Sequence, residues 1–179
     1  EGISVLDLGC GAGANSFMLI EEGFTVHGID FAPKAIERLR VRLAESASNA
    51  LQNFVVGDFK NLPWPDNFFD VIVDCMAIYA NDTATIEKVF QEIRRVLKKN
   101  GRFVSRSWGI ETMMISAGER LDEKTIVSAT SGPCAGFGVA HFFDQQEISR
   151  LFSDFDIDVL KKITKADKIT NQNTTEWTV

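Results

Sequence analysis

The sequence predicts an α/β fold, a doubly wound, mostly parallel seven-stranded sheet with an antiparallel last strand. Apolar runs of strand length alternate along the chain with stretches of helical period, a pattern typical of this class. Three glycines, Gly9, Gly11 and Gly13, directly follow the first apolar run, as expected where a strand turns tightly into a helix. With 179 residues, of which 45% are hydrophobic, the chain can build one sizeable core, and we expect a single domain over residues 1–179.

The parallel part of the sheet is expected within the first 108 residues. The first helix contains Phe17 and ends at Gly23, a residue type common at helix C-termini. The second begins at Pro33, which suits a first helical turn. The third contains Ile86 and ends in the Lys-Lys-Asn-Gly stretch at 98–101. The strands are expected at 3–8, 25–29, 53–56, 69–73 and 102–108.

The remaining third of the chain has a different pattern. Residues 109–143 combine a short helix with a turn-rich stretch, and they are too many for a simple connection. We interpret them as a lid inserted over a site. Asp144 and Glu147 have the spacing of a capping box for a helix through Phe152. Two more strands are expected at 156–160 and 175–179, and nearby lysines are interpreted as a solvated sheet edge: Lys161, Lys162, Lys165 and Lys168.

Composition and charge exclude several functions. A net charge of −6 disfavours broad binding to nucleic-acid phosphates. No apolar run approaches the roughly 20 residues that a membrane-spanning helix needs. Cys10, Cys75 and Cys134 form no CxxC pair, so we expect neither disulfides nor a metal site, and a reducing cytoplasm fits best. Because the chain opens at Glu1 rather than Met and enters a strand pattern at once, we expect that residues precede it.

The segment VLDLGCGAG, residues 5–13, indicates a nucleotide-like cofactor, since glycines let the backbone approach a ligand before a helix N-terminus. Asp7 narrows the choice. A carboxylate at this place repels the pyrophosphate of a dinucleotide but attracts an ammonium group, such as that of S-adenosylmethionine. The glycine spacing reads GxGxG rather than GxGxxG, and the chain contains no GxxxxGK[ST] motif, which excludes a P-loop.

Two further strand ends carry acids. Asp30 lies 17 residues after Gly13, where a carboxylate can accept hydrogen bonds from ribose hydroxyls. Asp58 and Phe59 follow the third strand, where a carboxylate and an aromatic ring suit adenine. Each acid alone could be a turn former. Because the carboxyl ends of parallel strands meet at one edge of a sheet, the three acids together predict one cofactor site.

These features resemble the class I S-adenosylmethionine-dependent methyltransferases. Four segments within residues 1–108 carry the resemblance in the family's order: VLDLGCGAG, GIDFAP, GDFKNLPWPDNFFDVIV and IRRVLKKNGRFV. The stretch LPWPDNFFDVI is most similar to the branch that includes quinone-biosynthesis and other small-molecule methyltransferases. The resemblance implies a Rossmann-like methyltransferase fold, S-adenosylmethionine as cofactor with S-adenosylhomocysteine as product, and a small-molecule acceptor.

The resemblance also implies residue roles and shows three departures. By resemblance Asp7, Gly9, Cys10, Gly11 and Gly13 line the methionine end of the cofactor, Asp30 and Phe31 the ribose, Asp58 and Phe59 the adenine, and Cys75 and Met76 the sulfonium and methyl group. The helices that the family places before the first strand are absent, and Ala32 stands where relatives often have a capping serine. The stretch 74–81 lacks an Asn-Pro-Pro-aromatic motif, which argues against methylation of exocyclic amines on nucleic-acid bases.

Catalytic groups are harder to assign, because methyl transfer needs a general base only if the acceptor must lose a proton. His141 and Tyr79 are the candidates, and the alternative for His141 is a structural residue that anchors the lid. Trp64 is interpreted as a plug of its loop. Five apolar residues either line an acceptor pocket or fasten the lid: Met113, Met114, Phe137, Phe142 and Phe143.

Two other functions stay open. A non-catalytic domain that binds S-adenosylmethionine as a sensor would have the same cofactor motifs. A nicotinamide-dependent oxidoreductase is disfavoured by Asp7 and by the GxGxG spacing. The expected partner is a small-molecule acceptor rather than nucleic acid, with no membrane span, and the protein is expected to be a monomer or a homodimer.

Overall fold

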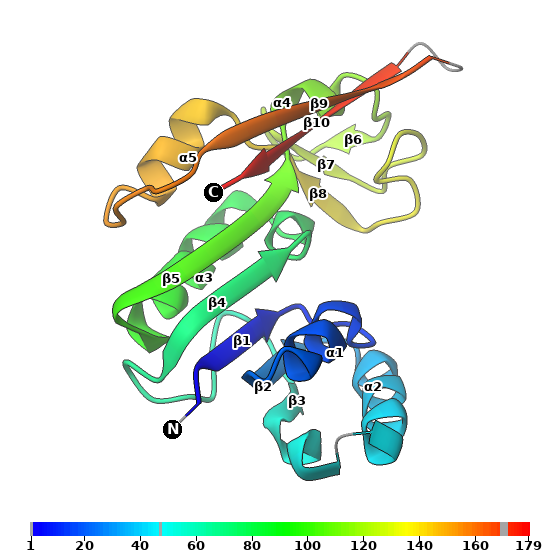
Figure 1. Ribbon diagram of the computed structural model, residues 1–179. Helices are drawn as coiled ribbons and strands as arrows, with labels where there is room; N and C mark the ends of the chain where they lie inside the picture. The colour runs from blue at the N-terminus through cyan, green and yellow to red at the C-terminus, as the bar shows by residue number, and fades with distance from the viewer. Residues whose placement is uncertain (1, 47, 169–171) are drawn as a thin grey trace. The chain divides into compact units, whose positions relative to one another are not determined.

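A computed structural model describes residues 2–46, 48–168 and 172–179 (Figure 1). The main sheet has seven strands in the order β3-β2-β1-β4-β5-β10-β9. The pairs β1–β2, β1–β4 and β2–β3 are parallel, whereas β10 runs antiparallel to both β5 and β9. The predicted α/β class, the seven-stranded sheet and the antiparallel last strand are therefore confirmed.

Strands and helices alternate along the first 108 residues as predicted. The strands are β1 Ser4–Leu8, β2 Thr25–Asp30, β3 Phe54–Val56, β4 Phe69–Cys75 and β5 Leu97–Trp108. The helices are α1 Ala14–Glu21, α2 Pro33–Ser46 and α3 Thr83–Val96, with short 3-10 helices η1 Ser48–Asn53 and η2 Ile78–Ala80.

The chain divides into two compact units, and the first comprises Glu1–Asp74 and Val89–Val104. Apolar residues of α2 recur at spacings of three and four and form one core with residues of β2, β3 and the turn after β1: Ile36, Leu39, Leu43, Val26, Phe54 and Cys10. The strand order reverses at β1, which lies between β2 and β4. In open α/β sheets ligands bind beyond the carboxyl ends of the strands at such a reversal. The turn after β1 is therefore the expected ligand site.

The second unit comprises Cys75–Lys88 and Ser105–Val179. Residues 109–143 contain the predicted short helix, α4 Ile110–Met113, and a small antiparallel sheet that was not predicted, formed by β6 Glu119–Arg120, β7 Thr125–Val127 and β8 Val139–His141. The remaining elements are α5 Gln145–Leu151, β9 Lys161–Asp167 and β10 Gln172–Thr178. The lid role of 109–143 stays a prediction.

The strand predicted at 156–160 is wrong. Hydrogen-bonded pairing with β10 begins at Lys161, which lies opposite Thr178, so 161–167 form the strand. The alternating apolar residues Ile157 and Val159, which suggested a strand, are instead exposed. Every residue of β9 is exposed, and β9 is the last strand in the sheet order, as expected for a lysine-rich edge.

The end of the third helix was also predicted too late. Helix α3 stops at Val96, and Leu97 already belongs to β5. The Lys-Lys-Asn-Gly stretch therefore lies in the strand, where Asn100 takes a positive φ of 66°. Cationic residues followed by Asn-Gly mark a turn as well as a helix end, and the sequence alone does not separate the two.

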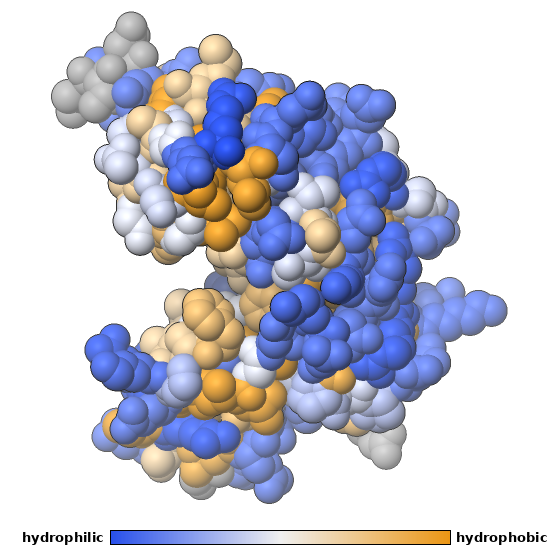
Figure 2. Space-filling model, turned by 180° about the vertical axis from the view of Figure 1, so that it is seen from behind, coloured by the Kyte–Doolittle hydropathy of each residue, from blue (hydrophilic) through white to orange (hydrophobic). Residues whose placement is uncertain are grey.

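Hydrophilic side chains dominate the face of the molecule seen in Figure 2, and hydrophobic side chains gather there in separate patches. Among the described residues no helix is long and apolar enough to cross a membrane.

Candidate functional site

The turn after β1 is built from glycines with positive φ angles, 75° at Gly9, 53° at Gly11 and 91° at Gly13. The backbone N–H groups of Gly9 and Cys10 donate to the carbonyl of Ile29 at 2.9 and 3.1 Å, which ties the turn to the end of β2. No described atom lies within 4 Å of a Cβ built on Gly11, so the turn is open at this residue. An open glycine turn before a helix is suited to a ligand that approaches the backbone.

Asp7, on β1 directly before this turn, is fully buried. Ser16 Oγ donates to Asp7 Oδ2 at 2.6 Å, while Oδ1 is buried and has no hydrogen-bond partner among the described residues. Burial raises the pKa of Asp7, and this effect exceeds the lowering by polar contacts with Ser16 and Asn15. An unpaired buried carboxylate oxygen is costly, and an ammonium group would supply both a donor and the opposite charge. The residues present therefore fit the amino group of S-adenosylmethionine.

Asp30, at the end of β2, holds the glycine turn in place. Its Oδ2 accepts the N–H of Gly11 at 2.9 Å, and its Oδ1 accepts the N–H of Ala32 at 2.9 Å. Asp30 thus satisfies the N–H of Ala32 directly before α2. Each carboxylate oxygen has a further lone pair, so Asp30 can still accept hydrogen bonds from ribose hydroxyls.

The end of β3 is joined to the end of β2, because Gly57 N donates to the carbonyl of Asp30 at 3.0 Å. Asp58 is partly held by Lys60, whose N–H donates to Oδ1 at 2.9 Å and whose Nζ lies 3.2 Å from Oδ2. Asp58 and Phe31 are exposed, whereas Phe59 is buried. Asp58 can therefore reach an adenine amino group, while little of the Phe59 ring faces solvent.

The thiol of Cys10 does not face the turn. It belongs to the core beside Val26 and Phe54, and burial raises its pKa far above the ordinary value. A Cβ on Gly28, the facing residue of β2, would lie 2.8 Å from Cys10 Sγ and 2.6 Å from Phe54 Cδ1. The Cys10 side chain is therefore an apolar filler of the core, and the predicted contact of Cys10 with the cofactor can be made only through its backbone.

The loop that follows Asp58 and Phe59 is clamped by Arg95 of α3, which sequence reasoning missed. Arg95 Nη2 donates to the carbonyl of Leu62 at 2.9 Å, and Nη1 donates to that of Trp64 at 2.8 Å. The guanidinium also pairs with Glu92, whose Oε2 accepts the N–H of Leu62 at 2.7 Å. The hydrogen bond from Arg95 lowers the pKa of Glu92, so the carboxylate stays charged.

Trp64 packs edge-on against His27, with ring centroids 5.9 Å apart, and against Phe69 at 5.2 Å. This packing supports its interpretation as a plug of the loop. Burial among these rings lowers the pKa of His27, as expected for a residue with a structural role.

Cys75 and Met76 follow β4 at the start of the second unit. Met76 has a φ of 60°, which is rare for a residue with a side chain, and its N–H donates to the carbonyl of Arg106 at 2.9 Å. Strained residues of this kind gather at functional sites. The predicted contact of Cys75 and Met76 with the sulfonium stays a prediction.

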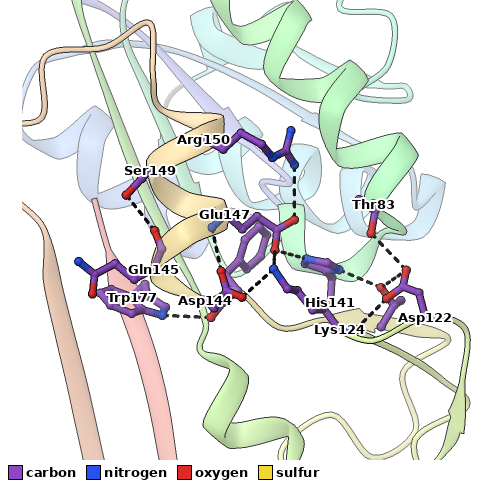
Figure 3. A network of polar contacts seen from close by, with 12 residues as sticks. Thr83, Asp122, Lys124, His141, Asp144, Gln145, Glu147, Ser149, Arg150 and Trp177 are labelled. Atoms are coloured by element: carbon purple, nitrogen blue, oxygen red, sulfur yellow. Dashed lines mark hydrogen bonds and ion pairs between the residues drawn. The ribbon is translucent and has the colours of Figure 1, made fainter.

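The two catalytic candidates both lie in the second unit, whereas the glycine turn and the three acids lie in the first. Tyr79, in η2, is buried, and its ring meets those of Trp108 and Phe137. His141, at the end of β8, is fully buried and belongs to a network of polar contacts (Figure 3). Its Nδ1 lies 2.8 Å from Thr125 Oγ1, and its Nε2 lies 3.1 Å from Glu147 Oε2.

Both ring nitrogens of His141 have partners within the protein. Thr125 Oγ1, which contacts Nδ1, also donates to Asp122 Oδ2 at 2.9 Å. Glu147, which contacts Nε2, has a pKa below the ordinary value, because hydrogen bonds from His141 and Lys124 outweigh its burial. Neither ring nitrogen is therefore left free for a methyl acceptor. This arrangement favours the structural alternative over a general base.

The network around Glu147 was only partly visible in the sequence. Asp144 caps α5 as predicted, with its Oδ1 accepting the N–H of Glu147 at 2.8 Å. Lys124 joins both acids, with its Nζ 2.7 Å from Asp144 Oδ2 and 3.2 Å from Glu147 Oε2. The capping-box spacing predicted the helix. The contacts of Lys124 with the two acids could not be predicted, because Lys124 precedes β7, a strand that was itself not predicted.

The comparison with known families agrees with the site. A family model described as a methyltransferase domain matches residues 1–154. The chain therefore belongs to this methyltransferase-domain family, whose cofactor is S-adenosylmethionine.

Among curated proteins, a sterol 24-C-methyltransferase of Gibberella zeae is 36% identical over 109 residues, which cover 60% of this chain and 28% of that protein. A demethylmenaquinone methyltransferase of Symbiobacterium thermophilum is 33% identical over 107 residues, covering 58% of this chain and 41% of that protein. An arsenite methyltransferase of Halobacterium salinarum is 27% identical over 173 residues, covering 88% and 43%. The matched part thus spans less than half the length of each relative.

Solved structures show the same fold. An S-adenosylmethionine-dependent methyltransferase of Methanosarcina mazei has a TM-score of 0.77 at 22% identity, covering 99% of this chain and 91% of that one. A 1,6-didemethyltoxoflavin-N1-methyltransferase of Burkholderia thailandensis, solved with S-adenosylhomocysteine, has a TM-score of 0.68 at 15% identity, covering 99% and 70%.

Proposed function

We propose that the protein transfers a methyl group from S-adenosylmethionine to a small-molecule acceptor. The observation that carries the proposal is the unpaired, buried Oδ1 of Asp7 beside an open glycine turn. A pyrophosphate would meet a negative charge here, while an ammonium group would complete the hydrogen bonding of the carboxylate.

The residues of the first unit would hold the cofactor by its three parts. Asp7 binds the ammonium group, Asp30 accepts from the ribose hydroxyls, and Asp58 accepts from the adenine amino group. S-adenosylmethionine supplies a methyl group that is electrophilic because it is bound to a sulfonium. Exclusion of water and orientation of the acceptor then provide most of the catalysis, since the reaction removes a positive charge.

The small-molecule acceptor is supported by the names of the relatives, which act on a sterol, demethylmenaquinone and arsenite. The net charge of −6 supports the same class over nucleic acid. The free thiols of the three cysteines, Cys10, Cys75 and Cys134, support a reducing, cytoplasmic compartment. We expect the protein to act as a monomer or a homodimer.

Calorimetry with S-adenosylhomocysteine tests the proposal. The protein is expected to bind it, and Asp30→Ala is expected to abolish binding because it releases both the ribose and the glycine turn. Glu37→Gln serves as a matched control, since Glu37 is an exposed acid on α2 of the same unit. A folded protein that binds neither S-adenosylmethionine nor S-adenosylhomocysteine would overturn the proposal.

A further inference from the structure

Three aromatic side chains from separate segments meet in the second unit. Tyr79 comes from η2, Trp108 ends β5, and Phe137 lies in the turn-rich stretch before β8. The Tyr79 ring is edge-on to both others, with centroid distances of 6.4 Å to Trp108 and 6.5 Å to Phe137. These distances and angles are those of interacting aromatic pairs.

Trp108 brings an unused polar group to this cluster. Its indole Nε1 is buried and has no hydrogen-bond partner among the described residues. The indole nitrogen can only donate, and a buried donor without an acceptor is rare in native proteins. For comparison, the buried Trp177 donates from Nε1 to the carbonyl of Phe143 at 3.1 Å. A ligand with an oxygen or nitrogen acceptor could therefore complete the hydrogen bonding of Trp108 Nε1.

The five apolar residues for which the sequence analysis left two roles open, acceptor pocket or lid attachment, differ in their exposure. Met113, Phe142 and Phe143 are buried and belong to the core of this unit. Phe137 is 50% exposed and Met114 is 86% exposed, which is unusual for side chains of this size. Only these two remain available to an incoming molecule.

Phe137 lies between two glycines that leave open space beside it. Gly136 has a φ of 83°, and no described atom lies within 4 Å of a Cβ built on Gly136 or Gly138. The half-exposed Phe137 ring is therefore accessible for stacking with another flat ring beside Tyr79.

We propose that Tyr79, Trp108 and Phe137 form the subsite that recognises the methyl acceptor, and that the acceptor is a flat, conjugated ring molecule with a hydrogen-bond-accepting oxygen or nitrogen. The ring contacts Tyr79 and Phe137, and the heteroatom accepts from Trp108 Nε1. This assignment rests on the proposed methyltransferase function and narrows its acceptor class.

The test uses coumarin, a flat bicycle with a carbonyl, and naphthalene, a similar bicycle without one. The chain has three tryptophans, so its ¹H–¹⁵N spectrum contains three indole signals, which single Trp→Phe variants assign. Coumarin is expected to bind about tenfold more tightly than naphthalene, the value of one hydrogen bond to a buried donor, and to shift the Trp108 signal.

Two variants sharpen the result. Trp108→Phe keeps an aromatic ring and removes the N–H, so coumarin should lose about tenfold in affinity while naphthalene is unchanged. Trp177→Phe removes an N–H that already has a partner and should leave both affinities unchanged. If Trp108→Phe does not fold, two measurements on the unmodified protein still test the assignment: the shift of the Trp108 indole signal and the ratio of the affinities for coumarin and naphthalene.

Equal affinities for the two probes, no binding of coumarin, or a shift confined to another tryptophan would overturn the assignment. Calorimetry with S-adenosylhomocysteine on the same sample keeps the two proposals separate. Retained cofactor binding with failure of coumarin rejects the subsite alone, whereas failure of S-adenosylhomocysteine rejects the proposed function.

Discussion

Asp7 in the first unit and Glu147 in the second are both buried acids, but their surroundings differ. Asp7 has one hydrogen-bonded oxygen and one unpaired oxygen, and burial raises its pKa. Glu147 contacts His141 and Lys124, and these hydrogen bonds outweigh burial and lower its pKa. Burial alone therefore does not mark a binding site. At Asp7 the incomplete hydrogen bonding lies next to an open glycine turn and leaves room for a donor from a ligand, while Glu147 is paired within the protein and holds the fold together.

The largest expected effect follows from neutralising the unpaired acid. Asp7→Asn keeps the size of the side chain but removes the charge that pairs with the ammonium group. Affinity for S-adenosylhomocysteine should fall about 100-fold, as expected when one partner of a buried charge pair is lost. Thermal stability should stay level or rise, because a desolvated charge is removed. Calorimetry and thermal melting measure the two effects, and a strong loss of stability would contradict the comparison.

The paired acid should behave in the opposite way. Glu147→Gln removes the buried charge that contacts His141 and Lys124 and should lower the free energy of unfolding by about 2 kcal/mol. Affinity for S-adenosylhomocysteine should not change in the folded protein. Glu87→Gln is a suitable control, because Glu87 forms an ion pair with Arg150 that is largely exposed. Chemical denaturation of both variants checks the difference.

Acidification should separate the two acids. The pKa of Asp7 is raised above its ordinary 3.8, so Asp7 becomes protonated first as the pH falls. Protonation removes a buried charge, and with it the attraction for the proposed ammonium group. The pKa of Glu147 is lowered below 4.5, so its stabilising contribution is complete above that pH and is lost only as the pH falls through the lowered pKa. Cofactor affinity should therefore fall, by up to about tenfold per pH unit, before the fold weakens.

Calorimetric titrations with S-adenosylhomocysteine across this pH range, with melting curves on the same samples, measure both transitions. Asp7→Asn should lose the acid-dependent part of the binding curve. A cofactor affinity that falls only together with unfolding would show that Asp7 does not hold the ammonium group.

A smaller effect is expected from the loop clamp. Arg95→Lys keeps the charge but cannot reach the carbonyls of Leu62 and Trp64 with a planar fork. Stability should fall by about 1 kcal/mol, and cofactor affinity should weaken a few-fold because Asp58 precedes the loosened loop. Arg94→Lys, one position earlier on α3, provides the control. Equal losses of stability and cofactor affinity in the two variants would contradict a role of Arg95 in holding the loop.

The smallest effect is spectroscopic and needs no variant. The pKa of His27 is lowered by burial, so His27 should show the ¹⁵N shifts of a neutral ring at neutral pH. The ¹⁵N shifts of an imidazolium at that pH would contradict the burial of His27 among the aromatic rings of the first unit.

Much of the first unit follows from local sequence signals. Glycines after a strand, an acid at each strand end and helical spacing in α2 act within a few residues, so their consequences can be inferred from the sequence. The second unit depends on contacts between distant segments. Strands β6 to β8 are two or three residues long, and β9 was displaced from 156–160 because pairing with β10, not its apolar pattern, defines it.

The site shows the same division. Asp7, Asp30 and Asp58 could be named because their strand ends could be predicted. Ser16, which donates to Asp7, and Arg95, which holds the loop after β3, act through side chains whose partners lie 9 to 33 residues away. The position of His141 is held by hydrogen-bonding contacts through Thr125 to Asp122, which no spacing rule reveals.

The buried thiols give the protein a built-in set of unfolding reporters. Cys10 is buried in the first unit and Cys134 in the second, and burial raises the pKa of Cys134 to about 11. Neither can react with an alkylating reagent until its own surroundings open. Timed alkylation followed by peptide mass analysis would therefore read the opening rate of each unit separately, without any engineered label.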